Sequence, residues 1–473
     1  MSNKHRIIAL IALIIGASAP ASGTAATPAS IDISRSAVHR GFNSSETSIS
    51  IADAGSGREL AGHLPDLALN PASCMKIITS TAALALLGPA HGYRTDFLTD
   101  RRFSGGTIGT LYVRGDGNPM LVNEDLMEIA GWLHEKGLRR ITGGIAIDNS
   151  FFDSYEFPRK GGNETRAYTA KTAATSVNFN SVAVVVAPGA RSGAPGVATT
   201  NPPTEYFRIV NKLVTGGRFR VDIAMKQDGD GEAIVVSGSI PPRAAEQQFY
   251  RSVTDPARYA GSVIKYMLEQ NGIAVEGAVR PATTPAQATL LLYVPSKPMS
   301  EILREMNKRS NNFMAEQTLK HLGAVKYGAP GSTAKGVKAL EEYLASIGIA
   351  KGGYTLENGS GLSAETRISA RQLVRVLSAA YRNSSIRDAF MDSLSVLGID
   401  GTTKSWRFAP DLTGRILVKT GTINSVSALA GYAPTASGKL AAFAILANGL
   451  PRGAWVAHVA ELEVVRAITE AQQ

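Results

Sequence analysis

The chain has 473 residues, 44% hydrophobic and 19% charged, so it can build sizeable cores and is not a disordered polymer. Its 47 glycines and 22 prolines follow no collagen-like period, which excludes a fibrous protein. An aromatic content of 7% argues against a stacking platform for single-stranded nucleic acid. At roughly 100 to 200 residues per domain, the length predicts two to four domains, or one domain with large insertions.

Residues 1–26 have the pattern of a secretory signal peptide. Lys4 and Arg6 precede an apolar run at 7–15, and small residues at 17–26 offer cleavage sites of the Ala-x-Ala type. The run is shorter than the ~20 residues that span a bilayer, so we expect a periplasmic protein exported without an anchor. Loss of the two cations with the signal lowers the formal net charge from +10 to +8, which suits loose association with an acidic wall or a membrane surface. Nucleic acid is not an expected partner there.

Cysteine and histidine usage points away from disulfides and metals. Cys74 is the only cysteine, and we interpret it as a small buried helix residue rather than a nucleophile, because no histidine lies near it in sequence. The seven histidines show no metal-ligand spacing, so no metal or other cofactor is expected. The acidic segment 228–232 lacks the twelfth-position Glu of a calcium loop and indicates a hairpin tip.

The predicted elements begin with a strand over 47–52 and an apolar helix over 73–87. From Tyr93 to Pro295, short alternating runs such as 144–148 are separated by Gly, Pro, Asn and Asp turns, with an occasional helix such as 124–136. This middle region is therefore expected to be rich in strands.

Helical periodicity returns after Pro298. It predicts three helices, over 301–322 ending at Gly323, over 335–347 ending at Gly348, and over 370–382. Three strands and a last helix follow, over 415–419, 426–432, 439–446 and 454–470. The order indicates a mixed α/β body that is split by a β-rich insertion.

The first candidate catalytic motif is Ser73 with Lys76, at the start of the predicted helix 73–87. Residues three apart share one helical face, so the amine can sit beside the hydroxyl, and the helix N-terminus favours negative charge at the serine. A lysine whose pKa is lowered by burial or by positive charge can activate a serine without histidine. Ser332 and Lys335 have the same spacing, but there we expect a helix N-cap and a solvated lysine.

The second motif is Ser310 with Asn312, on a turn between or within helices. Its hydroxyl can relay a proton, and its amide can hydrogen-bond a substrate amide. Ser176 and Asn178 match the same spacing, but they lie in the β-rich middle with no lysine signature near them.

The third motif, Lys419 to Thr422, follows the strand that ends at Val418. The cation of Lys419 can attract a substrate carboxylate, the hydroxyls of Thr420 and Thr422 can bind it, and Gly421 permits close approach. The three motifs occur in chain order, each on a suitable element, which favours a catalytic site over three coincidences.

The set Ser73-x-x-Lys76, Ser310-x-Asn312 and Lys419-Thr420-Gly421 resembles that of the penicillin-recognising serine enzymes, the D-Ala-D-Ala peptidases and the serine β-lactamases. The long interval 77–309 between the first two motifs resembles the class C low-molecular-mass penicillin-binding proteins, which are D-alanyl-D-alanine carboxypeptidase/endopeptidases. Further stretches agree with that family, namely 70–76, 144–153, 177–180, 312–316, 359–363 and 431–448.

The resemblance implies an α/β fold of the α+β type, with a penicillin-binding, β-lactamase-like transpeptidase domain split by a large β-rich insertion that forms two smaller domains. It implies a catalytic domain of residues 27–93 and 296–473, an inserted second domain of 94–175 and 253–295, and a third domain of 176–252 inserted in the second.

The resemblance also implies roles for the first two motifs. Ser73 attacks the carbonyl of the penultimate D-alanine with Lys76 as general base, and water hydrolyses the acyl-enzyme. Ser310 passes the proton to the leaving amine, while Asn312 orients Lys76 and the substrate amide. The implied substrates are peptidoglycan stem peptides and their D-Ala cross-links, with β-lactam antibiotics as acylating inhibitors.

In the third motif, the resemblance implies that Lys419, Thr420 and Thr422 hold the terminal carboxylate. The backbone N–H groups of Ser73 and Thr422 form the oxyanion hole, and the role of Gly421 is structural. No metal takes part.

Some positions depart from the family pattern. Asn311 and Asn358 stand where Asp is commoner. Ala364 stands where many relatives carry an Arg that binds the diaminopimelate side chain, and Asn163 and Glu164 are both candidates for its acidic counterpart. A preference for meso-diaminopimelate is therefore the least supported implication.

Two alternatives remain at this stage. A serine β-lactamase would need a fast route for water to the acyl-enzyme, commonly a dedicated Glu, and none can be assigned. A non-catalytic wall-binding protein is disfavoured because every reacting residue is present.

Overall fold

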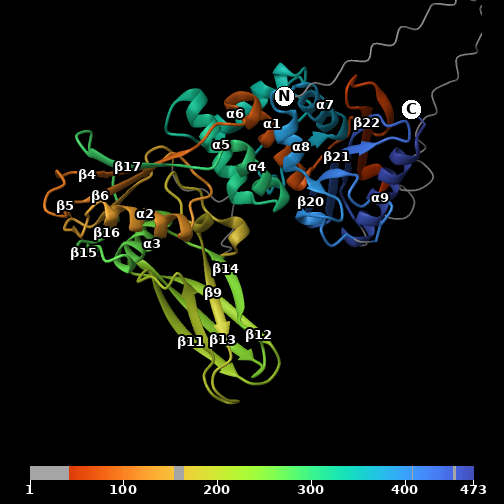
Figure 1. Ribbon diagram of the computed structural model, residues 1–473. Helices are drawn as coiled ribbons and strands as arrows, with labels where there is room; N and C mark the ends of the chain where they lie inside the picture. The colour runs from red at the N-terminus through yellow and green to blue at the C-terminus, as the bar shows by residue number, and fades with distance from the viewer. Residues whose placement is uncertain (1–41, 154–164, 407, 451–453, 473) are drawn as a thin grey trace, which may run out of the picture.

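The structure is a computed structural model that describes residues 42–153, 165–406, 408–450 and 454–472 (Figure 1). The expected signal peptide, Asn163 and Glu164 lie outside these ranges. Among the described residues, no helix combines the length and the apolar character that a membrane span requires. The same residues contain no group of three or more side chains that could hold a metal ion.

A six-stranded antiparallel sheet joins the two ends of the chain (Figure 1). In spatial order its strands are β19 (Ser395–Val396), β20 (Leu417–Ile423), β21 (Val426–Pro434), β22 (Leu440–Ala447), β1 (Thr47–Asp53) and β2 (Glu59–His63). β1 pairs with β22 over its whole length, from Thr47 opposite Ala447 to Asp53 opposite Ala441. A two-stranded ladder, β3 (Ala68–Leu69) with β18 (Ile368–Ser369), lies outside this sheet.

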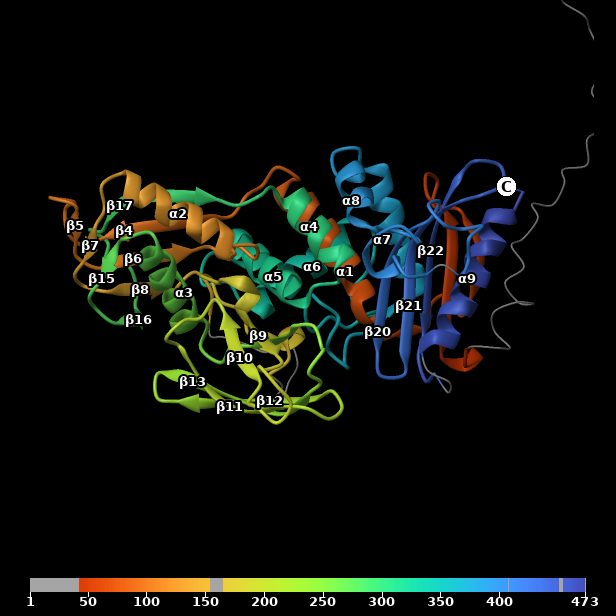
Figure 2. The same ribbon diagram turned by 60° about the horizontal axis from the view of Figure 1, so that its bottom comes forward.

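Helices cover both faces of this sheet (Figure 2). One face carries α1 (Met75–Leu87), α4 (Met299–Lys308), α5 (Asn312–Tyr327), α6 (Thr333–Ser346), α7 (Ala370–Arg382) and α8 (Arg387–Ser393), and the other carries α9 (Ala454–Glu470). Because side chains alternate along a strand, Ala428 and Ala430 of β21 join the core with α1, whereas Leu429 joins the core with α9. The α1 helix is thus sandwiched between the sheet and other helices.

The expected β-rich middle contains a five-stranded mixed sheet with two helices. Its strands are β16 (Val279–Pro281), β8 (Ile145–Asp148), β6 (Leu111–Gly115), β4 (Arg94–Thr99) and β17 (Thr289–Pro295), and its helices are α2 (Asn123–Glu135) and α3 (Pro256–Gln270). A small parallel sheet joins β15 (Ala274–Val275), β7 (Arg140–Ile141) and β5 (Thr107–Ile108).

Two three-stranded sheets project from the rest of the molecule (Figure 1). They are β10 (Val197–Asn201), β9 (Ser181–Ala187), β14 (Gln247–Ser252), and β11 (Phe207–Thr215), β13 (Gly231–Ile240), β12 (Arg220–Asp228). Asp228 pairs with Gly231 at the end of the β12–β13 ladder, so the interpretation of 228–232 as a hairpin tip is confirmed.

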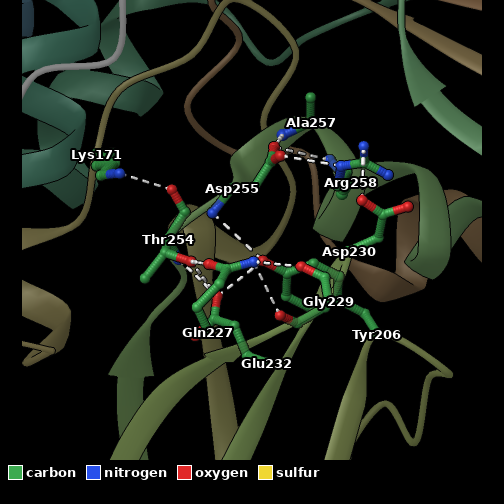
Figure 3. Close-up of polar contacts among 11 residues, drawn as sticks. Lys171, Tyr206, Gln227, Gly229, Asp230, Glu232, Thr254, Asp255, Ala257 and Arg258 are labelled. Carbon is green, nitrogen blue, oxygen red and sulfur yellow. Dashed lines mark hydrogen bonds and ion pairs between the residues drawn. The ribbon is translucent and has the colours of Figure 1, made fainter.

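A buried polar cluster fixes the projecting sheets to the helix α3 (Figure 3). Glu232 is 1% exposed, and its Oε1 accepts hydrogen bonds from the Tyr206 hydroxyl at 2.8 Å and from the Thr254 backbone N–H at 2.7 Å. Lys171 Nζ donates to the Thr254 carbonyl at 2.7 Å, and the Asp255 side chain caps α3. These contacts join three segments of the chain at one point.

Two predicted elements are wrong in their bounds. The single helix expected over 301–322 is two helices, because Ser310 has a left-handed φ of 53° that ends α4 and the Asn311 side chain then caps α5. The second helix also continues past Gly323 to Tyr327. A side chain at Gly323 would lie 2.7 Å from the Gly336 backbone nitrogen, so this glycine serves the close approach of α6 and not a helix end.

The strand expected over 415–419 is displaced toward the C-terminus. β20 spans Leu417–Ile423, since its ladder with β21 continues through Thr422 opposite Ser427 and Ile423 opposite Val426. The third motif therefore lies within the strand and not after it. The helices predicted over 370–382 and 454–470 are confirmed as α7 and α9.

An acidic side chain is buried between α9 and the sheet. Glu461 is 0% exposed, and its Oε1 accepts a hydrogen bond from the Ser427 hydroxyl at 2.6 Å. Its Oε2 has no partner among the described residues. Burial raises the pKa of this carboxyl to about 8.

Replacement of this carboxyl should change how stability depends on pH. The pKa of a Glu in the unfolded chain is about 4.3, whereas the pKa of Glu461 in the folded protein is about 8. The free energy of unfolding therefore falls as pH rises between these two values. As pH rises from 5 to 8, the free energy of unfolding of Glu461→Gln should therefore increase by about 1 kcal/mol or more relative to that of the unsubstituted protein. Urea unfolding at several pH values measures this gain. Glu463→Gln, on the partly exposed side of the same helix, is the control, and an equal gain in both variants would contradict the expectation.

Candidate active site

The candidate nucleophile Ser73 lies in a 3-10 turn, Ala72–Cys74, that leads into α1. Ala72 has a left-handed φ of 44°, a strained conformation for a residue with a side chain. The Asn70 side chain accepts a hydrogen bond from the Ala72 N–H at 2.8 Å, and Asn448 Oδ1 accepts one from the Asn70 N–H at 3.1 Å. Two amides thus hold the strained turn that presents the partly exposed serine.

Lys76 lies fully buried below the serine. Its Nζ is 3.0 Å from Ser73 Oγ, 2.8 Å from Asn312 Oδ1 and 2.7 Å from the Ser360 carbonyl. Burial, with the positive charge of Lys419 as the second cause, lowers the pKa of Lys76 well below its usual value. In the neutral amine two N–H groups donate to Asn312 and Ser360, and the lone pair is left for the Ser73 proton.

Glu316 and Ser360 belong to this arrangement, and we assigned them no role from the sequence. Glu316 follows Asn312 by one turn of α5, is 4% exposed, and accepts from the backbone N–H groups of Gly359 at 3.2 Å and Ser360 at 2.9 Å. The carboxyl fixes the loop whose carbonyl binds Lys76. Both residues lie in family-like stretches, and a charged residue four positions after Asn312 was the available signal.

The second and third motifs form the opposite wall of the site. Lys419 Nζ, fully buried, donates to Ser310 Oγ at 2.9 Å and to the Thr420 carbonyl at 2.7 Å. Burial lowers the pKa of Lys419 to about 8. The left-handed backbone of Ser310 turns the chain so that Asn312 enters the first turn of α5 beside Lys76.

The strand β20 runs very close to Ser73, the candidate nucleophile. A side chain at Gly421 would lie 2.7 Å from the Pro71 carbonyl oxygen and 2.9 Å from the Ser73 nitrogen, so only glycine fits without displacement. The Thr420 hydroxyl lies 2.7 Å from the Thr402 hydroxyl, and no signal in the sequence indicated this contact of Thr402. Thr422, near the C-terminal end of β20, is exposed to solvent.

Cys74, the last residue of the turn that carries Ser73, packs against β20. It is fully buried, its Sγ donates to the Lys419 carbonyl at 3.2 Å, and burial raises the pKa of the thiol to about 12. The interpretation of this cysteine as a buried helix residue is confirmed.

The two sequence decoys are structural. Ser332 caps α6 by accepting from the Lys335 backbone N–H at 3.1 Å, as expected. Lys335 Nζ donates to backbone carbonyls of the preceding loop. Ser176 Oγ donates to the Ala173 carbonyl at 2.7 Å, and Asn178 pairs with Asn123, so neither joins a lysine.

Comparison with known proteins gives a consistent result. A profile of the D-Ala-D-Ala carboxypeptidase 3 (S13) family matches residues 30–469. The D-alanyl-D-alanine carboxypeptidase of Actinomadura sp. (strain R39) is 32% identical over 462 residues, covering 92% of this chain and 84% of that protein. The crystal structure of penicillin binding protein 4 from Haemophilus influenzae matches with a TM-score of 0.76 at 22% identity, covering 91% of this chain and 98% of that one. Its complex with a β-lactam matches with a TM-score of 0.73, also at 22% identity.

The chain therefore belongs to the D-Ala-D-Ala carboxypeptidase 3 (S13) family. Its mixed α/β architecture is the expected penicillin-binding fold with inserted sheets.

The close packing of Gly421 gives a specific expectation. In Gly421→Ala the added methyl group displaces the Ser73 N–H, so the rate of acylation by a fluorescent penicillin should fall about 100-fold, as when an oxyanion donor is removed. Gly131→Ala on α2 is the control, because its methyl group would come no closer than 3.5 Å to Asn271 Oδ1. Unchanged acylation in a folded Gly421→Ala protein would contradict this expectation.

The pKa of Lys419 predicts an alkaline limit to activity. With a pKa of about 8, Lys419 loses its positive charge as pH rises through about 8, and with it the attraction that we expect for a substrate carboxylate. The ratio kcat/KM for a D-Ala-D-Ala peptide should therefore decline there. In Lys419→Arg the guanidinium stays charged, so the decline should move to higher pH whatever the absolute rate. The same descending limb in both proteins would disprove the assignment.

Proposed function

We propose that this protein is a serine-type D-Ala-D-Ala carboxypeptidase that also acts as a DD-endopeptidase, through an acyl-enzyme on Ser73. The observation that carries the proposal is the buried Lys76 amine, held between Ser73, Asn312 and Ser360 with a lowered pKa. A solvated lysine would be protonated at neutral pH and could not serve as a base.

In the proposed reaction Lys76 takes the proton of Ser73 as its Oγ attacks the carbonyl of the penultimate D-alanine. The negative charge that develops on the carbonyl oxygen is stabilised by the N–H groups of Ser73 and Thr422, consistent with the close approach of β20 to the serine. Asn312 orients Lys76 and the substrate amide. Water then hydrolyses the ester and frees Ser73.

On the leaving side, Ser310 passes a proton to the amine that departs. Its contact with Lys419, 2.9 Å away, supports this role, because a nearby ammonium makes a hydroxyl a better proton donor. Lys419, Thr420 and Thr422 hold the terminal carboxylate of the leaving residue, and the Thr402 hydroxyl positions that of Thr420.

The remaining expectations form part of the same proposal. The protein acts in the periplasm after removal of the signal peptide, on peptidoglycan stem peptides, with loose attachment to the wall or membrane surface. β-Lactams acylate Ser73, as the β-lactam complex of the Haemophilus influenzae structure suggests. The catalytic domain comprises 27–93 and 296–473, the second domain 94–175 and 253–295, and the third 176–252.

Digestion of purified muropeptides, followed by mass spectrometry, tests the proposal. The mature protein should remove one alanine from pentapeptide monomers and split cross-linked dimers, and Ser73→Ala should do neither. Ser332→Ala, at the decoy motif, is the matched control and should keep both activities. A folded protein that releases no product from either substrate would disprove the proposal.

The β-lactamase alternative gives a different result in the same preparation. Stable labelling by penicillin, with slow release, supports the peptidase. Rapid multiple turnover of nitrocefin without release of alanine from peptides would favour the β-lactamase. Binding to peptidoglycan with neither reaction would favour a non-catalytic wall-binding protein.

A further inference from the structure

A cavity of about 440 Å³ includes Ser310 and Asn312 of the site in its lining, and the reaction proposed above gives no role to its other lining residues. Segment 309–313 forms one wall, and segments 122–124 and 167–168 form another. Asn178 and Phe179 extend the lining, and the sheet β10–β9–β14 of the projecting region closes it. A cavity of this size is in the range that holds a ligand much larger than a single amino acid.

The chemistry of the lining is that of a peptide-binding surface. Its amide side chains are those of Asn123, Asn178, Asn201, Gln248, Asn311 and Asn312. Amides both donate and accept hydrogen bonds, as backbone peptide groups do. Tyr168 and Tyr250, which are 45% and 57% exposed, add aromatic faces that can pack against methyl and methylene groups. Among the residues that the structure describes, the charged lining residues are Glu124 and Arg309, and Arg309 is paired with Glu305.

The wall at Phe179 is built at a conformational cost. Asn178, Phe179 and Asn180 have φ values of 51°, 58° and 49°, three consecutive left-handed residues of which none is glycine. A left-handed backbone is strained for residues that carry a side chain, and such strain is concentrated at functional sites. Asn178 Nδ2 donates to Asn123 Oδ1 at 2.7 Å, and the Phe179 ring meets the edge of Phe313 at a centroid distance of 6.2 Å. The strained segment thus places an aromatic ring in the lining of the cavity, against the first turn of α5.

The walls of the cavity are held together by polar contacts outside it. Asn180 Nδ2 donates to the Lys171 carbonyl at 2.8 Å, and Lys171 Nζ donates to the Thr254 carbonyl at 2.7 Å (Figure 3). The Ser252 N–H at the end of β14 donates to the Thr165 carbonyl at 2.9 Å. The strand β14 and the segment that carries Tyr168 are therefore fixed to each other, so the cavity is preformed.

We propose that this cavity binds the leaving strand of a cross-linked peptidoglycan peptide, the half that departs with the amine when a D-Ala cross-link is cut. The inference rests on the proposed function, in which Ser310 gives its proton to the leaving amine. The leaving group must then lie against Ser310, which lines the cavity.

The bonds account for the need for space. The C–N bond of the cross-link breaks, the carbonyl carbon forms an ester with Ser73 Oγ, and the serine proton ends on the leaving amine by way of Lys76 and Ser310. When the leaving group is free D-alanine, it ends within reach of Lys419. When it is the second peptide of a dimer, several further amide groups and a methylene chain continue beyond Ser310, and the amide-rich cavity matches them.

Substitutions on the projecting sheet test the inference away from the reacting groups. Tyr250→Ala and Gln248→Ala on β14 should lower kcat/KM for splitting cross-linked dimers about tenfold, within the range for loss of an aromatic contact in an interface. The value of kcat/KM for removing D-alanine from pentapeptides, and the rate of acylation by penicillin, should change less than about twofold, the precision of such assays. Tyr293→Ala is the matched control, because Tyr293 is a tyrosine of similar exposure, 55%, on β17.

The outcomes separate this inference from the function on which it rests. Unchanged splitting of dimers by both variants, or equal losses on monomers and dimers, would overturn the inference. Repeating the assay with dimers stripped of their sugars distinguishes a peptide from a glycan occupant, and a loss that disappears without the sugars would also overturn it. Wild-type protein that trims pentapeptides but does not split dimers defeats the inference and the endopeptidase part of the proposed function, and leaves the carboxypeptidase part standing. Wild-type protein that neither hydrolyses peptides nor is acylated defeats the proposed function with it.

Discussion

The buried amine of Lys76 is the constraint on which the rest of the site depends. A lysine in the core is costly as a cation, and no carboxylate of the described part of the chain bonds to the Lys76 Nζ. The cost is reduced when the amine is neutral and all of its hydrogen-bonding capacity is used. Those partners come from the turn before α1, from the first turn of α5 and from the loop at Ser360, so the position of the amine depends on how three separate segments pack. Glu316, which fixes the loop, is part of the same packing.

Much of this arrangement could be predicted from local sequence. The helices α7 and α9 follow from apolar spacing and, for α7, from the Ser369 cap, both of which are properties of consecutive residues. The motifs at Ser73 and Lys419 were recognisable because their chemistry requires particular residue types at short spacing. In the structure, Asn312 contacts Lys76 and Ser310 contacts Lys419, so the second motif joins the other two in one site.

Other features depend on contacts that a local pattern does not contain. The break at Ser310 requires a left-handed serine, which no spacing rule indicates. The extension of β20 depends on its pairing with β21, and the role of Glu316 depends on a loop more than forty positions away. The strained segment at Phe179 likewise contacts Phe313 only because α5 packs beside it in the folded chain. The inserted sheets therefore contribute to the site through surfaces that become adjacent only in the folded chain.

The pairing of β1 with β22 has a consequence for how the protein becomes active. The strand β1, which precedes Ser73 in the chain, completes its pairing with residues 441–447, and the Asn70 N–H is held by Asn448. The turn at Ser73 cannot reach its final geometry until residues 441–448 are in place, whereas the inserted sheets contain most of their own pairings and can form earlier. A chain without residues 441–448 therefore lacks this support for Ser73, and the hydrolytic centre is assembled later than the inserted sheets.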